Sequence, residues 1–168
     1  LHIVHRDVSP ANILVSYEGA VKIIDFGIAK AVSKLSMTRP GLIKGKISYM
    51  SPEQMRGQPI DRRSDVFAVG IILYELIAGR RLFAAKTDVD TIRNVIKGNI
   101  PPLEGVRPDV PPELVQIVLK ALERDPDNRF AWASEMSGAL QAFMLRSGLH
   151  SARQDLSQHM QQWLRDVD

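Results

Sequence analysis

The hydrophobic positions divide the chain into a short β-type start and a long helical remainder. Residues 13–15 and 21–24 are two short apolar runs, and Glu18 and Gly19 between them are typical turn residues. Two such runs joined by a short polar turn predict an antiparallel hairpin. The start of the chain is therefore expected to be a hairpin, and the helices are expected to follow it.

Later segments repeat apolar residues with the period of an α-helix. They are residues 64–78, 87–98, 111–122, 134–145 and 151–167. The first is apolar on nearly every face, which predicts a helix buried on all sides. The last is amphipathic, and its polar face mixes arginine with aspartate, which favours packing on the protein over binding to a membrane. The expected fold is α+β and mainly α-helical, with one short hairpin.

Composition and charge narrow the class of protein. With 168 residues and 45% hydrophobic content, the chain is long enough to bury the core of a domain. Its 22 basic and 19 acidic residues leave a net charge of +3, which is too small to indicate nucleic-acid binding. There is no cysteine, which excludes disulfides and thiol chemistry and agrees with a cytoplasmic protein. The longest apolar segment, residues 66–78, is too short to span a bilayer.

Residues suited to catalysis and metal binding are concentrated at the start of the chain. They are the triplet His5, Arg6 and Asp7, then Asn12, then the triplet Asp25, Phe26 and Gly27. The predicted hairpin lies between Asn12 and Asp25, so it would fold these two residues back towards each other. Amide and carboxylate oxygens are the ligands that Mg²⁺ prefers. The spacing therefore predicts a metal site formed by Asn12 and Asp25.

These motifs resemble the HRDxxxxN catalytic loop and the DFG metal loop of protein kinases. The resemblance is to the large lobe of a eukaryotic-like serine/threonine kinase of the bacterial type. It implies transfer of the ATP γ-phosphate to a serine or threonine of a protein substrate. Asp7 would accept the proton of that hydroxyl, Asn12 and Asp25 would bind Mg²⁺, and Leu14 would pack under the adenine ring. Tyrosine kinases place an arginine between the positions of Asp7 and Asn12, and this chain has none there.

The resemblance also divides the chain into regions. A kinase large lobe is expected over residues 1–146 and a helical tail over 147–168. Within the lobe, the catalytic loop is 5–12, the metal loop 25–27 and the activation segment 28–53. No G-x-G-x-x-G occurs in the sequence, so the small lobe that carries this loop is an expected partner upstream, and the 168 residues alone are expected to be inactive. The alternative is a non-catalytic interaction module that keeps the fold without the activity.

Several further positions match structural residues of the family. The segment 51–53 resembles the A-P-E sequence that closes the activation segment, and Arg129 matches the arginine that pairs with its glutamate, here Glu53. Asp65 matches the carboxylate that holds the backbone of the catalytic loop, although a residue at a helix start can equally act as a cap. His5, Phe26 and Gly27 belong to the conserved motifs of the family.

Arg6 resembles the arginine that receives a phosphate from the activation segment. Ser36 and Thr38 are the candidate phosphosites in that segment. The alternative is that both are ordinary solvated hydroxyls, because serine and threonine favour loops.

One position departs from the family pattern. Serine/threonine kinases usually have a lysine two residues after the catalytic aspartate, but this chain has Ser9. Lys46 stands where the family usually has a threonine that contacts the same aspartate. We predict that the two partners are exchanged, so that Lys46 places the missing cation beside Asp7 and Ser9 supplies the hydroxyl. The alternative is a solvent-facing Lys46, because lysine is usually exposed.

Overall fold

The computed structural model describes residues 3–26, 46–149 and 153–165. The predicted residues Gly27, Ser36 and Thr38, and most of segment 28–53, lie outside these ranges. In chain order the described elements are η1 (Pro10–Asn12), β1 (Ile13–Val15), β2 (Val21–Ile23), η2 (Ile47–Tyr49), α2 (Pro52–Met55), α3 (Arg62–Ala78), α4 (Asp88–Lys97), η3 (Leu103–Gly105), α5 (Pro112–Ala121), η4 (Pro126–Asn128), α6 (Ala133–Arg146) and α7 (Arg153–Arg165).

The predicted hairpin is present. Strands β1 and β2 pair antiparallel, with Ile13 opposite Ile23 and Val15 opposite Val21. Gly19 turns the chain with a φ of +73°, a conformation that glycine adopts at no steric cost. Beyond the strands, the Ile24 N–H donates to the Asn12 carbonyl at 2.9 Å. The open end of the hairpin thus places Asn12 directly beside the residue that precedes Asp25.

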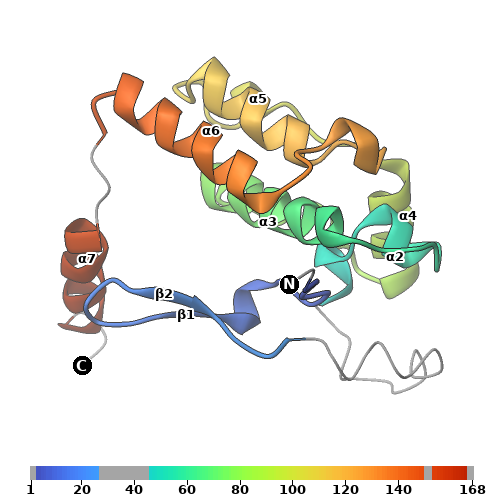
Figure 1. Cartoon of the computed structure of the whole chain (residues 1–168), viewed down its shortest axis with the longest axis horizontal. Helices are drawn as coiled ribbons and strands as arrows, with labels where there is room; N and C mark the ends of the chain where they lie inside the picture. The colour runs from blue at the N-terminus through green and yellow to red at the C-terminus, as the bar shows by residue number, and fades with distance from the viewer. Residues whose placement is uncertain (1–2, 27–45, 150–152, 166–168) are drawn as a thin grey trace.

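Helix α3 lies at the centre of the helical body and packs against α5 and α6 (Figure 1). Gly70 lets α3 and α5 approach closely, because a Cβ at that position would lie 2.9 Å from the Cβ of Ala121. The apolar core forms two clusters around α3. One consists of Tyr49, Phe67, Ile71, Tyr74, Phe83, Val95, Leu103, Val110, Val115, Val118 and Leu122, and the other of Val66, Ile117, Ala121, Phe130, Met136 and Phe143.

Two expectations about α3 are corrected. The helix begins at Arg62 rather than residue 64, because the Asp61 side chain accepts from the Arg63 N–H and caps it. Asp61 therefore takes the capping role considered for Asp65. The helix is also not buried on every face, since Leu76 in its last turn is 74% exposed. The buried residues of α3 lie in its first four turns, from Ser64 to Tyr74.

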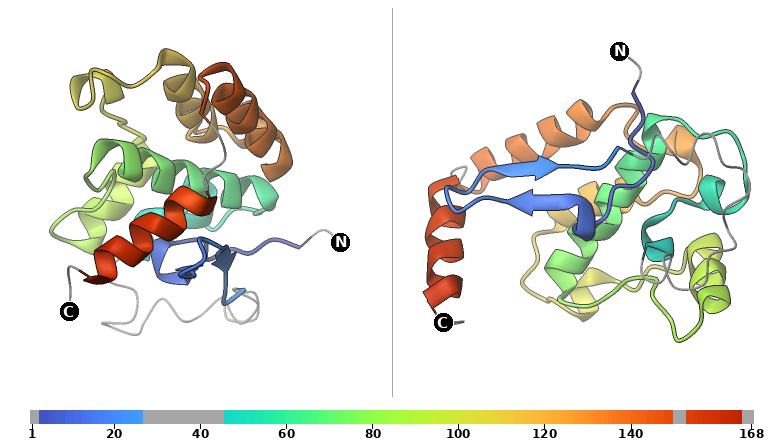
Figure 2. Two further views of the ribbon diagram at one scale, coloured as in Figure 1. Left: turned by 90° about the vertical axis from the view of Figure 1, so that its left-hand side faces the viewer. Right: turned by 90° about the horizontal axis from the view of Figure 1, so that it is seen from below.

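Helix α7 packs on the tip of the hairpin, far along the chain from it (Figure 2). The Ser157 hydroxyl donates to the Tyr17 carbonyl at 2.6 Å, and Arg153 Nε donates to the Glu18 carbonyl at 3.0 Å. A Cβ on Gly19 would lie 2.1 Å from the Arg153 carbonyl oxygen, so only glycine allows this approach. The tail therefore contacts the protein itself, as its mixed charge predicted. None of the described helices has the length and hydropathy needed to cross a membrane.

Candidate active site

Helix α3 holds the loop that carries Asp7. The backbone N–H groups of His5 and Arg6 donate to the two carboxylate oxygens of Asp65 at 2.8 and 2.9 Å. Burial raises the pKa of the Asp65 carboxyl, and these two donors offset only part of that effect. Asp65 is thus where the family resemblance placed it, as a support of the loop backbone.

His5 connects this loop to the segment that contains Asp25. Its buried ring donates from Nε2 to the Ile24 carbonyl at 3.1 Å, and Nδ1 accepts from the Asp7 N–H at 3.3 Å. The ring also contacts Phe26, with ring centroids 4.7 Å apart. Because one side chain touches both segments, His5 fixes the position of Asp7 relative to the end of the hairpin.

The two predicted metal ligands lie at the open end of the hairpin. Asn12 is 3% exposed, and its Nδ2 donates to the Asp7 carbonyl at 2.7 Å, which leaves its Oδ1 available as a ligand. Asp25 is exposed and has a φ of +57°. A non-glycine residue in this region is strained, and such strain is concentrated at functional sites. Within the described residues no three His, Cys, Asp or Glu side chains form a metal site by themselves. The hard oxygens of Asn12 and Asp25 fit Mg²⁺ when phosphate oxygens supply other ligands.

Lys46 lies beside Asp7. Its Nζ donates to Asp7 Oδ2 at 3.0 Å, and the two side chains are 34% and 11% exposed. The contact expected between the two residues is therefore present, and its role in catalysis remains a proposal. The position of Ser9 differs from the expectation. Its hydroxyl is buried and has no hydrogen-bond partner among the described residues, so it forms no hydrogen bond with Asp7 or Lys46.

Asp7 and Lys46 line a small pocket formed by the loop, η2, α2 and α3. The pocket is lined by Arg6, Asp7, Val8, Lys46, Tyr49, Met50, Gln54, Ser64, Asp65 and Ala68. Leu14, predicted to contact adenine, lies outside this pocket on the hairpin, where it is 53% exposed. Asp7 therefore lines a concave site that does not include the apolar surface of the hairpin.

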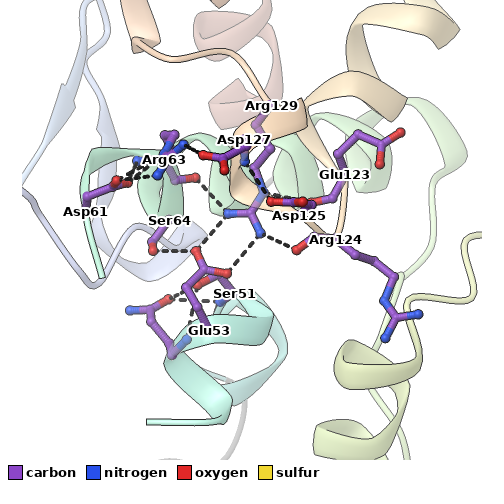
Figure 3. Close-up of polar contacts among 11 residues, drawn as sticks. Ser51, Glu53, Asp61, Arg63, Ser64, Glu123, Arg124, Asp125, Asp127 and Arg129 are labelled. Carbon is purple, nitrogen blue, oxygen red and sulfur yellow. Dashed lines mark hydrogen bonds and ion pairs between the residues drawn. The ribbon is translucent and has the colours of Figure 1, made fainter. Parts of the chain in front are cut away.

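A buried ion pair anchors helix α2, which begins at the end of the expected activation segment (Figure 3). Arg129 NH1 and NH2 donate to the two oxygens of Glu53 at 2.7 and 2.9 Å, and the Ser64 hydroxyl donates to Glu53 Oε1 at 2.6 Å. The Arg129 side chain is 0% exposed and also donates to the Glu123 carbonyl at 2.7 Å. The predicted bidentate pair is thus present, with its remaining donors satisfied by backbone carbonyls.

This pair predicts a loss of stability in acid. Burial raises the pKa of Glu53, but hydrogen bonds from Arg129 and Ser64 outweigh it and lower the pKa from 4.5 to about 2. Because the folded pKa is depressed, the stabilisation is complete above pH 4.5 and is lost as the pH falls towards 2. We expect Glu53 to account for a loss of about 2 kcal/mol in the free energy of unfolding between pH 5.5 and pH 3.

Urea unfolding at the two pH values tests this, with Glu53→Gln as the control that cannot titrate. The loss between pH 5.5 and pH 3 should be smaller in the variant by about that amount. An equal loss in both proteins would contradict the assignment.

Gln54 is a site residue that the interpretation of the sequence missed. Its Nε2 donates to the Arg6 carbonyl at 3.1 Å, which joins α2 to the loop that carries Asp7. Ser51 and Gln54 also form a capping box at the start of α2. The S-x-x-Q spacing of that box was the available signal. It predicts the helix start, but it does not predict the contact with Arg6, which is distant in sequence.

Comparison with known proteins assigns the family. The protein kinase domain family matches residues 1–140, so the chain belongs to the protein kinase family. The chain is 45% identical over 144 residues to Tyrosine-protein kinase MasK of Myxococcus xanthus, which covers 86% of this chain and 22% of MasK. It is 43% identical over 140 residues to Serine/threonine-protein kinase PknB of Mycolicibacterium smegmatis, which covers 82% of this chain and 22% of PknB. The chain thus spans about a fifth of the length of these curated relatives.

A solved structure agrees with the fold. The twitchin kinase region from C. elegans matches with a TM-score of 0.64 and 22% sequence identity, and the match covers 83% of this chain and 24% of the twitchin chain. At this identity the likeness is one of fold. The expected fold, a mainly helical kinase large lobe with a short hairpin, is therefore confirmed.

Proposed function

We propose that this chain supplies the acceptor side and the metal ligands of a protein serine/threonine kinase, which transfers the γ-phosphate of ATP to a hydroxyl of a protein. One observation carries the proposal. The carboxylate of Asp7 lies in the pocket, and the buried Asn12 at the end of the hairpin donates to the Asp7 carbonyl. The proposed general base, Asp7, and one proposed metal ligand, Asn12, are therefore joined by a hydrogen bond within one loop.

In the proposed reaction, Asp7 accepts the proton of the substrate hydroxyl. The hydroxyl oxygen forms a bond to the γ-phosphorus, the bond from that phosphorus to the β,γ-bridging oxygen breaks, and ADP leaves. Lys46 orients the Asp7 carboxylate through their ion pair at 3.0 Å. Asn12 and Asp25 would hold Mg²⁺, which neutralises phosphate charge when it is bound with ATP. Leu14 would contact the adenine ring. Because ATP is the donor, we place the reaction in the cytoplasm.

A small lobe that closes over ATP is part of the proposal. The hairpin exposes apolar side chains that include Leu14 at 53%, Val21 at 56% and Ile23 at 45%. Exposed apolar surface of this kind marks a site for a partner. We propose that an upstream lobe with a glycine-rich loop covers it, and that the 168 residues alone do not transfer phosphate.

The test is radiolabelled phosphate transfer from ATP to a general protein substrate, with the chain extended by its upstream coding sequence. We expect transfer to serine or threonine, and we expect Asp7→Asn to lower kcat by about a thousandfold, because general-base catalysis contributes 10² to 10⁴-fold. Asp109→Asn, at an exposed carboxylate, is the control and should leave kcat unchanged.

Three outcomes would count against the proposal in different ways. Full turnover by the Asp7→Asn variant would remove Asp7 from the reaction. Phosphotyrosine as the only product would overturn the acceptor class, and MasK is a relative whose name includes that activity. An absence of transfer and of Mg-ATP binding by the extended chain would favour the non-catalytic interaction module.

A further inference from the structure

The contact between Gln54 and Arg6 connects two parts of the site that are distant in the chain. Gln54 is half-buried in α2, directly after Glu53, and it lines the same pocket as Asp7. Its Nε2 donates to the Arg6 carbonyl at 3.1 Å. Arg6 has a φ of +66°, a left-handed conformation that costs a non-glycine residue free energy. Surrounding contacts must therefore hold Arg6 in this conformation.

The structure supplies such contacts on both sides of Arg6. On one side, the Arg6 N–H donates to Asp65 Oδ1 at 2.9 Å. On the other side, the Arg6 carbonyl accepts from Gln54. That carbonyl and the N–H of Asp7 belong to one planar peptide unit. Fixing the carbonyl therefore also fixes the Asp7 N–H, which donates to His5 Nδ1 at 3.3 Å.

We propose that Gln54 is a positioning residue for Asp7. Its amide holds the Arg6–Asp7 peptide plane and so couples the start of α2, anchored by the Glu53–Arg129 pair, to the orientation of the Asp7 carboxylate. The proposal rests on the proposed function only in treating Asp7 as the general base. The coupling itself is a property of the loop and does not require activity.

A purely structural role for Gln54 is the competing explanation. Its Oε1 accepts from the Ser51 N–H at 2.9 Å and from the Ser51 hydroxyl at 3.1 Å, which completes the capping box of α2. Glutamate is equally suited to this position of a capping box. It keeps both acceptor contacts but has no N–H to donate to Arg6. Gln54→Glu therefore separates the cap from the contact with the loop.

Hydrogen exchange of the 168-residue chain, followed by NMR, tests the coupling. In Gln54→Glu we expect the Arg6 and Asp7 amides to exchange about tenfold faster, while amides in the buried part of α3 and the thermal midpoint stay as in the wild type. The matched control is Ser51→Ala, which removes the cap and leaves the donor of Gln54. It should lower the thermal midpoint without selectively accelerating exchange at Arg6 and Asp7.

Unchanged exchange at Arg6 and Asp7 in a folded Gln54→Glu variant would overturn the proposal and leave Gln54 as a cap. If that variant does not fold, hydrogen exchange of the Gln54 side chain in the wild type decides whether the contact with Arg6 exists. One side-chain amide proton of Gln54 should then be protected from exchange, and exchange of both at the rate of free glutamine would refute the contact.

Activity provides a separate measurement. In the extended chain, Gln54→Glu should lower kcat about tenfold with little change in KM for ATP or protein. A complete lack of activity in the wild-type extended chain would refute the proposed function, whereas the exchange result would still decide the positioning role.

Discussion

Arg129→Met is expected to lower the free energy of unfolding by about 3–5 kcal/mol. The variant leaves the carboxylate of Glu53, which is 5% exposed, without its bidentate partner. Breaking a buried pair by removing one partner costs about this much, because an uncompensated charge stays in a poorly solvated site. Domains of this size have only about 5–15 kcal/mol of stability in total. The loss is measured by urea unfolding at pH 7.

The design includes two controls. Arg107→Met removes a partner from the Arg107–Asp109 pair, whose side chains are 53% and 71% exposed, and it should cost far less stability than Arg129→Met. The double variant Glu53→Met/Arg129→Met removes both charges and should be more stable than Arg129→Met alone. A cost for Arg129→Met no larger than that for Arg107→Met would show that the buried pair contributes little.

Secondary structure, which depends on residues close together in the sequence, was the easiest part of the fold to predict. The hairpin follows from two apolar runs around Glu18 and Gly19, and the helices follow from their apolar period. The helix boundaries depended on single caps, as Asp61 shows, because its side chain starts α3 two residues before the predicted residue 64. The exposure of Leu76 was not predictable, since periodicity shows that a residue is apolar but does not show which elements cover it.

For the site, motif spacing predicted the residues but not all of their contacts. Asn12 and Asp25 flank one hairpin, and Asp7 lies in the loop that leads into it, so the contact of Asn12 with Asp7 follows from local structure. Two other features depend on how the loop packs against the rest of the protein. One is the contact of Gln54 with Arg6, and the other is the buried Ser9 hydroxyl, which has no hydrogen-bond partner among the described residues. A single sequence carries no signal for either of them.

If Lys46 replaces the lysine that serine/threonine kinases usually have at the position of Ser9, its removal should have a large effect on catalysis. In the extended chain, Lys46→Thr should lower kcat by about 10 to 100-fold, because two unit charges at this distance attract by a few kcal/mol when they are partly screened. Lys97→Met, at an exposed lysine on α4, is the control and should leave kcat unchanged.

The double variant Ser9→Lys/Lys46→Thr restores the arrangement usual in serine/threonine kinases, with a lysine two residues after the aspartate and a threonine in the later segment. Ser9→Lys alone places a second cation beside the Lys46–Asp7 pair and should also reduce kcat. Because a lysine at either position would serve as the cation for Asp7, the two effects should not add, and the double variant should recover to within about threefold of the wild type. Thermal unfolding of each variant shows whether a lower kcat reflects a lost fold. Simple additivity of the two losses in folded proteins would mean that Lys46 does not replace the missing lysine, and that its ion pair with Asp7 at 3.0 Å contributes to the structure of the loop alone.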